Sequence, residues 1–171
     1  ILEGAWSRTS AGGEVSTLPF HAFRGDTTRF GPPETTGAAD ALLQVDGTWA
    51  VTFRDEDGEE AARGELRQSE GDRVEGTFLT PTGDYRFLEG DYRDGVLRLS
   101  TFDGSHAFLF EATAQPDGTL EGDFWSRDVY HATWTARPLG EGEEVLPDAW
   151  NQVGLTNDEG RFSFSFPDLD G

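Results

Sequence analysis

Residues 120–125 read LEGDFW, and the pattern in their first five letters occurs five times in the chain: an aliphatic residue, an acid, a glycine, a variable residue and an aromatic residue. The other four copies are LEGAW (2–6), VDGTW (45–49), VEGTF (74–78) and LEGDY (88–92). In an extended strand, alternate residues share a face, so the aliphatic residue, the glycine and the aromatic residue lie together. Glycine inside a strand leaves room where strands bend sharply or a bulky neighbour packs. The motif therefore indicates a small, strongly coiled β-barrel with aromatic side chains beside the gaps.

Short alternating segments separated by turn sequences fill residues 45–137. The turns include Asp-Gly at 57–58, 94–95 and 103–104 and Pro-Asp-Gly at 116–118. Glycine at these positions supplies the positive φ that tight hairpin turns need. A turn about every ten residues is typical of an antiparallel meander. We therefore predict an all-β fold, a meander of about eight to ten strands that closes into a lipocalin-like or calycin-like β-barrel.

The alternation also predicts which side chains face the interior. A flat sheet would leave one of its apolar strips in water, so closure into a barrel is favoured. In residues 130–136 the predicted shared face holds Tyr130, Ala132, Trp134 and Ala136, and in residues 106–112 it holds His106, Phe108, Phe110 and Ala112. The predicted interior residues are Trp49, Phe53, Phe78, Phe87, Phe108, Phe110, Phe124 and Trp134.

The chain of 171 residues is strongly acidic, with 33 Asp and Glu against 13 bases and a formal net charge of −20. Phosphate and anionic membrane surfaces attract clustered positive charge, so we expect no nucleic-acid partner and no membrane contact by this domain. All the bases are Arg, and Ile occurs only at Ile1, a halophile-like bias typical of a GC-rich genome and a high-salt environment.

Cysteine and methionine are absent from the sequence. Thiol catalysis, cysteine-based zinc sites and disulfides are therefore excluded within this chain. No apolar run reaches the roughly 20 residues of a membrane helix, and we expect no signal peptide within the residues given. Because the sequence begins at Ile1 rather than Met, we expect a processed protein or a fragment.

Three regions follow from these patterns. Residues 1–137 form the predicted barrel domain, with its core at 45–137 and two further strands within residues 1–30. Residues 138–160 are acidic, are broken by Pro147 and lack periodicity, as expected of a linker. Residues 161–171, RFSFSFPDLDG, alternate and stop at a turn, which predicts the start of a truncated following domain.

Several stretches resemble a known family. The segment FSFPDLDG (164–171) resembles the opening strand and turn of the thioredoxin-like domain in TlpA-like thiol-disulfide oxidoreductases. The stretches VEGTFLTPTGDYRFLEG (74–90), LSTFDGSHAFLF (99–110) and LEGDFWS (120–126), followed by TWTA (133–136), resemble the β-rich domain that precedes it in a subgroup of these proteins. This part of the resemblance covers about residues 45–150.

The resemblance implies that the parent protein is an extracytoplasmic (periplasmic), membrane-anchored reductase with a Cys-x-x-Cys pair. This sequence ends before any such pair, so none of the family's catalytic residues can be assigned here. The implied partners are a substrate protein or the parent's own thioredoxin-like domain. Family members often carry a His and a Glu before the TW, whereas this chain has Val129, Tyr130, His131 and Ala132.

Polar and aromatic residues within these motifs are the candidate binding residues. In one interpretation they gather at a barrel mouth, where aromatic walls and convergent polar groups bind a small ligand. In the other they are turn formers and cross-strand pairs. A metal site built from His106 and His131 lacks the spacing of known ligand motifs, so no metal is predicted. The candidates are Asp84, Tyr85, Arg86, Asp103, His106, Asp123, Trp125, His131 and Trp134.

Three functions are consistent with the sequence. The first is a non-catalytic accessory domain that recognises substrate for a thiol-disulfide oxidoreductase, as the resemblance implies. The second is a lipocalin-like barrel that binds a small apolar ligand. The third is a hydrolase that uses buried acids, although 33 acids make chance carboxylate pairs inevitable. We predict that the chain itself is not an enzyme and uses no cofactor.

Overall fold

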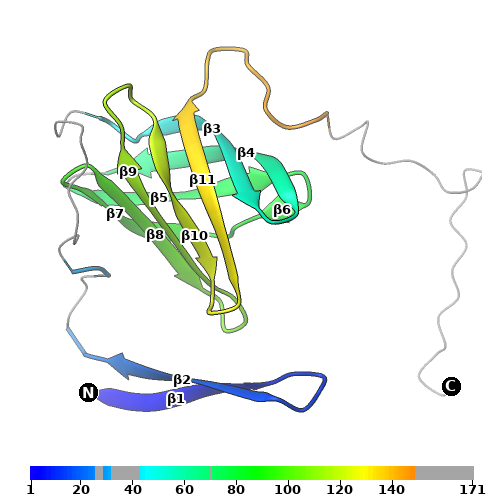
Figure 1. The fold of residues 1–171 in the computed structure, drawn as a ribbon. Helices are drawn as coiled ribbons and strands as arrows, with labels where there is room; N and C mark the ends of the chain where they lie inside the picture. Colours follow the sequence, from blue (N-terminus) through cyan, green and yellow to red (C-terminus); the bar gives the residue numbers. More distant parts are fainter. Residues whose placement is uncertain (26–28, 32–42, 70, 149–171) are drawn as a thin grey trace, which may run out of the picture. The chain divides into compact units, whose positions relative to one another are not determined.

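The computed structural model describes residues 1–25, 29–31, 43–69 and 71–148 (Figure 1). The chain divides into two compact units, residues 1–31 and residues 32–171. The described residues contain β-strands and turns but no helix, so none of them forms a helix that could cross a membrane. The predicted all-β class is confirmed.

The first unit is a β-hairpin. Its strands β1 (Leu2–Thr9) and β2 (Val15–Ala22) pair antiparallel in a two-stranded sheet of their own and not with the barrel strands. Gly4 lies opposite Phe20, whose ring covers the space that a Cβ of Gly4 would occupy. This first copy of the motif therefore uses its glycine to seat an aromatic ring from the neighbouring strand.

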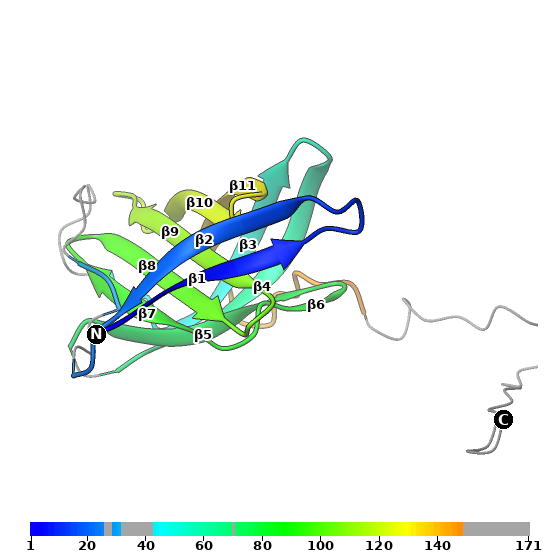
Figure 2. The same cartoon turned by 90° about the horizontal axis from the view of Figure 1, so that it is seen from below.

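The second unit contains a closed barrel. Its nine-stranded sheet has the order β4-β3-β11-β10-β9-β8-β7-β5-β6, and β4 also pairs with β5. Eight of the strands thus form a closed antiparallel meander, while β6 pairs only with β5. Figure 2 shows β7, β8 and β9 side by side in one wall. The bounds are β3 Gly47–Asp55, β4 Gly58–Gln68, β5 Arg73–Thr80, β6 Gly83–Asp84, β7 Leu88–Arg93, β8 Val96–Phe102, β9 Ala107–Ala114, β10 Leu120–Ser126 and β11 Tyr130–Pro138.

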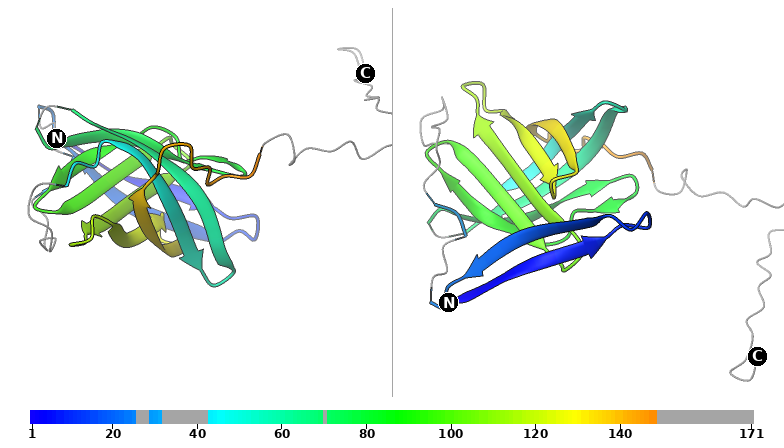
Figure 3. Two further views of the ribbon diagram at one scale, coloured as in Figure 1. Left: turned by 90° about the horizontal axis from the view of Figure 1, so that it is seen from above. Right: turned by 60° about the horizontal axis from the view of Figure 1, so that its bottom comes forward.

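The last strand closes the barrel against the first. Residues Thr133–Pro138 of β11 pair with Trp49–Arg54 of β3. In Figures 1 and 3, strands of opposite walls cross one another at a steep angle, as they do in a small, strongly coiled barrel. The predicted antiparallel meander of about eight to ten strands that closes into a lipocalin-like barrel is confirmed.

Aromatic rings fill the middle of the barrel. Phe110 and Phe124 stack with their centroids 4.3 Å apart, and Phe78 lies 4.8 Å from Phe110 and 5.3 Å from Trp134. Six of the predicted interior residues are buried, and Phe108 is half-buried against them. The six are Trp49, Phe53, Phe78, Phe110, Phe124 and Trp134. Burial of each such ring stabilises the fold by roughly 1.5–3 kcal/mol.

Inward-facing glycines explain how the barrel coils so tightly. A Cβ on Gly122 would lie 1.8 Å from the carbonyl oxygen of Glu111, and one on Gly76 would lie 2.2 Å from that of Glu65. At these two copies of the motif, the glycine lets the backbones of neighbouring strands approach to distances that any side chain would prevent. The aliphatic and aromatic residues on either side of each glycine are buried, as the alternation predicted.

Phe87 was predicted to be an interior residue, and this was wrong because its side chain is 94% exposed. The backbone N–H of Arg86 donates to Oδ1 of Asp84 at 2.8 Å, and Arg86 adopts a positive φ of 66°. This turn interrupts the alternation between β6 and β7. Tyr85 consequently takes the inward position, and the next inward residue is Leu88.

The segments after the barrel are described only in part. The backbone N–H of Leu139 donates to the carbonyl of Thr48 at 2.9 Å, and Arg137 forms an ion pair with Glu143. Residues 149–171, which include most of the predicted linker and all of the predicted following domain, lie outside the described residues.

The close approach at Gly122 can be tested with an alanine substitution. We expect Gly122→Ala to lower the free energy of unfolding by roughly 3 kcal/mol or more, because the new Cβ would collide with the backbone of β9. Gly83→Ala is the control, since its Cβ would meet nothing within 4 Å, and we expect a change of at most about 0.5 kcal/mol. Urea unfolding followed by tryptophan fluorescence measures both, and equal stabilities would contradict the proposed role of Gly122.

Candidate functional site

One end of the barrel is formed by the turns that follow β3, β8 and β10. Successive strands of an antiparallel meander run in opposite directions, so these turns meet at the same end, toward the lower right of Figure 1. A pocket of about 220 Å³ opens here, and we call it the aromatic mouth. Its lining residues are Phe53, Asp55, Asp57, Gly58, Glu59, Glu60, Tyr85 and Tyr130.

Three aromatic rings form the floor and walls of the aromatic mouth. Phe53 is only 4% exposed and forms the floor against the core. The ring centroid of Tyr85 lies 5.6 Å from that of Phe53 and 5.0 Å from that of Phe124. Tyr130 packs edge-on against Phe124 at 5.8 Å and keeps 41% of its surface exposed. A ligand can therefore reach the ring faces of the mouth but not the middle of the barrel.

Four carboxylates surround these rings. Asp55 accepts hydrogen bonds from the Tyr130 hydroxyl and from the backbone N–H groups of Asp57 (2.9 Å) and Gly58 (3.2 Å). These bonds, chiefly that from Tyr130, hold the pKa of the Asp55 carboxyl below its ordinary value. Glu59 pairs with Arg54 at 2.8 Å, while Glu60 brings a further negative charge. The mouth is therefore rich in negative charge even after the Arg54 pairing.

This environment raises the pKa values of the two tyrosines in the aromatic mouth. Burial, and after it the negative charges of Glu60 and Asp55, together raise the pKa of Tyr85 to about 12. The pKa of Tyr130 is raised mainly by its hydrogen bond to Asp55 and then by burial. Both side chains are neutral at physiological pH, and their ring faces remain electron-rich.

Four of the residues predicted from sequence lie in or beside the turns that follow β5 and β8, and two of these are hydrogen-bonded to each other within one turn. Asp103 accepts the backbone N–H groups of Ser105 (2.9 Å) and His106 (2.7 Å), and its Oδ2 lies 3.0 Å from Nδ1 of His106. The side-chain bond to His106 is the main reason that the pKa of Asp103 is lowered. Arg86 approaches Asp103 at 3.7 Å, and Asp84 holds the turn at Arg86. In these contacts the four residues stabilise turns.

The remaining candidates lie on β10 and β11. Nε2 of His131 lies 2.7 Å from Oδ1 of Asp123, and its ring centroid lies 5.5 Å from that of Trp125. These three side chains alternate with the buried residues of their strands, so they belong to the outer face. Trp134 is a core residue whose Nε1 donates to the carbonyl of Asp123 at 3.0 Å. Of the nine candidates, Tyr85 alone lines the mouth.

Sequence reasoning did not propose Asp55, Glu60 or Tyr130 as site residues. Tyr130 and Asp55 are 75 positions apart and meet because the last strand pairs with the first. One local signal could have located the site: five of the seven residues in RDEDGEE (54–60) are acids. This segment spans the turn between β3 and β4 and directly follows the predicted interior residue Phe53.

The fold and the mouth define a small antiparallel barrel with an acidic, aromatic opening. Among the described residues, no group of three His, Asp or Glu side chains is placed to hold a metal ion. No family model matches the chain, and no curated protein matches it.

The raised tyrosine pKa values predict how the protein titrates. All three tyrosines of the chain, Tyr85, Tyr92 and Tyr130, have pKa values above the ordinary 10, so we expect little phenolate absorbance at pH 10 in the folded protein. Unfolded tyrosines ionise near pH 10, so the folded state binds more protons above this pH and its stability falls as the pH rises from 10 towards 12. An ultraviolet titration of folded and urea-unfolded protein measures the difference. Superimposable curves would contradict the burial and hydrogen bonding described here.

Proposed function

We propose that the barrel is a small-molecule-binding protein whose aromatic mouth holds the cationic head group of an organic amine. One observation supports this most directly: the rings of Phe53, Tyr85 and Tyr130 line the same pocket as four carboxylates. A cation over an aromatic face is attracted by the ring quadrupole, by about 0.5–2 kcal/mol depending on its desolvation. The carboxylates add charge attraction and would orient the ligand.

The size of the mouth favours a head group rather than a whole drug-sized molecule. Pockets that enclose such molecules measure roughly 300–1,000 Å³, whereas the aromatic mouth measures about 220 Å³. A quaternary ammonium group fits this space and presents a weakly hydrated positive surface to the rings. The rest of the ligand would extend outward over the acidic turn at residues 55–60, because the core rings fill the space behind Phe53.

The other predicted roles rest on different support. The role as an accessory domain of a thiol-disulfide oxidoreductase, with an extracytoplasmic location, rests on the sequence resemblance alone and stays a prediction. The apolar ligand expected for a lipocalin-like barrel stays a prediction as well. The contacts of the mouth favour a charged head group over a wholly apolar molecule, because an apolar ligand would remove the carboxylates from water without compensating them.

Calorimetry with choline and with its uncharged analogue, in which a carbon replaces the nitrogen, tests the proposal. We expect choline to bind and the uncharged analogue to bind at least about 10-fold more weakly, because only the cation gains the ring and carboxylate attraction. Asp55→Asn should weaken choline binding about 3- to 10-fold while keeping an oxygen that accepts from Tyr130.

Glu121→Gln is the matched control, since Glu121 is an exposed acid of β10 outside the mouth. It removes the same charge and should leave choline binding within about twofold. Equal affinity for choline and its uncharged analogue, or an equal loss in Asp55→Asn and Glu121→Gln, would argue against a specific cation site and leave only the field of the acidic surface.

A further inference from the structure

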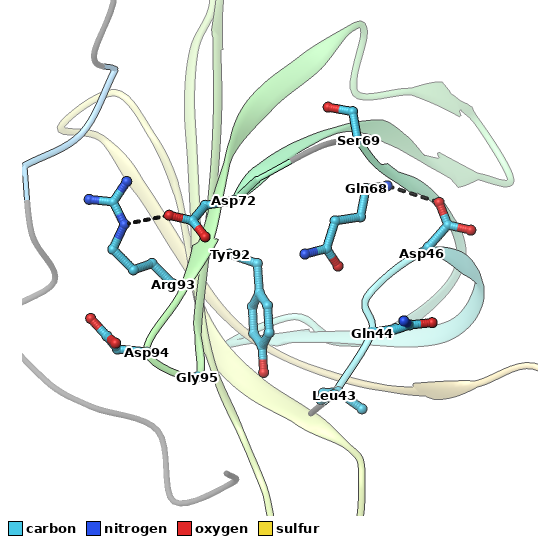
Figure 4. Close-up of a pocket in the computed structure, with 10 residues that line it drawn as sticks. All are labelled: Leu43, Gln44, Asp46, Gln68, Ser69, Asp72, Tyr92, Arg93, Asp94 and Gly95. Atoms are coloured by element: carbon cyan, nitrogen blue, oxygen red, sulfur yellow. Dashed lines mark hydrogen bonds and ion pairs between the residues drawn. The ribbon is translucent and has the colours of Figure 1, made fainter. Parts of the chain in front are cut away.

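The opposite end of the barrel contains a second cleft. It lies where β3 begins, β4 ends, β5 begins and β7 turns into β8, and its volume is about 710 Å³. We call it the polar cleft; Figure 4 shows its lining. The lining residues are Leu43, Gln44, Asp46, Gln68, Ser69, Asp72, Tyr92, Arg93, Asp94 and Gly95.

A buried phenol without a partner distinguishes the polar cleft. Tyr92 is only 7% exposed, and its hydroxyl makes no hydrogen bond with the described residues. A buried hydroxyl that loses its water without gaining a partner destabilises the fold, whereas phenylalanine would fill the same space without that cost. Figure 4 shows the Tyr92 ring lying in the opening, with its hydroxyl toward Leu43. The hydroxyl can both donate and accept, because burial raises its pKa and keeps it protonated.

Two carboxamides add further unused hydrogen-bonding groups. Oε1 of Gln68 accepts from the backbone N–H of Val45 at 3.3 Å, which orients the amide. Figure 4 shows the Gln68 side chain extending into the opening toward Tyr92. Within the described part of the chain, the amide nitrogen of Gln68 and the side chain of Gln44 make no hydrogen bond.

Several charged residues of the polar cleft already form ion pairs or hydrogen bonds within the protein. Nε of Arg93 pairs with Oδ2 of Asp72 at 3.0 Å, and both side chains lie on the other side of β7 from Tyr92 in Figure 4. Oδ1 of Asp46 accepts the backbone N–H of Gln68 at 2.9 Å. The groups left to meet a ligand inside the opening are therefore mainly neutral: a phenol, two amides and the apolar side chain of Leu43.

We propose that the polar cleft is a second ligand site, independent of the aromatic mouth, that binds a neutral, hydroxyl-rich molecule such as a sugar or another polyol. Amide and phenol groups pair with hydroxyls in both directions, as donors and as acceptors. An anionic ligand is disfavoured, because Asp46, Asp72 and Asp94 lie in the lining against one arginine that is already paired.

Chemical-shift perturbation with glucose, maltose and glycerol at millimolar concentrations tests this site on the chain as it is. At least one probe is expected to shift the backbone signals of residues 68–69 and 92–95 in a saturable way. Tyr92→Phe should weaken that binding about 3- to 10-fold, the effect of one lost hydrogen bond. It should also leave the thermal midpoint of the free protein unchanged or raise it, because the hydroxyl has no partner within the described residues.

Tyr130→Phe, in the aromatic mouth, is the matched control and should leave the binding of these probes unchanged, while Tyr92→Phe should leave choline binding unchanged. The two sites can thus fail separately. The proposal is overturned if none of the three probes shifts these signals, if Tyr92→Phe binds as tightly as the unmodified protein, or if Tyr92→Phe lowers the thermal midpoint of the free protein, since that would show that the hydroxyl has a structural partner.

Discussion

The backbone contact at Gly122 is the constraint on which the rest of this barrel depends. Because no side chain stands between Gly122 and the Glu111 carbonyl, β9 and β10 can coil against each other more closely than strands of ordinary residues. Gly76 plays the same part between β5 and β4. These two contacts lie on opposite walls and narrow the barrel. As a result, Phe78 and Phe124, the aromatic residues of the same two motifs, both contact the ring of Phe110.

A barrel whose middle is filled in this way leaves no room for a ligand among its core rings. Phe53 and Tyr85 close the core at one end, and Tyr92 closes it at the other. At each end, aromatic side chains packed against the core lie beside polar groups from the adjoining turns. Functional residues are often held in this way, on loops positioned by a rigid scaffold. The two ends differ in chemistry, since carboxylates dominate the aromatic mouth and neutral amides with a phenol dominate the interior of the polar cleft.

Local patterns predicted the strands and their faces, but they could not predict contacts that depend on how the sheet closes. Alternation correctly placed Ala132, Trp134 and Ala136 inside, because a strand's side-chain period does not depend on its partners. It failed at Phe87, because the side chain of Asp84 captures the N–H of Arg86 and adds a turn that no periodic pattern contains. Tyr130 was missed because the register of β11 against β3 is a long-range property, and a shift of one residue would reverse every face. The acids of residues 55–60 were missed although they lie together in the sequence.

The seam between β3 and β11 joins the fold to the proposed binding. At one end of the seam the Tyr130 hydroxyl donates to Asp55, and at the other the N–H of Leu139 donates to the carbonyl of Thr48. Asp55 and Tyr130, two residues of the proposed cation-binding site, thus also link the first strand of the barrel to the last. Suppose that a ligand binds only when β3 and β11 are paired. Its binding then stabilises the pairing of these strands by the same free energy by which the pairing favours binding. If the proposed ligand binds there, it would influence the stability of the barrel without any lid, because Asp55 and Tyr130 take part in the closure.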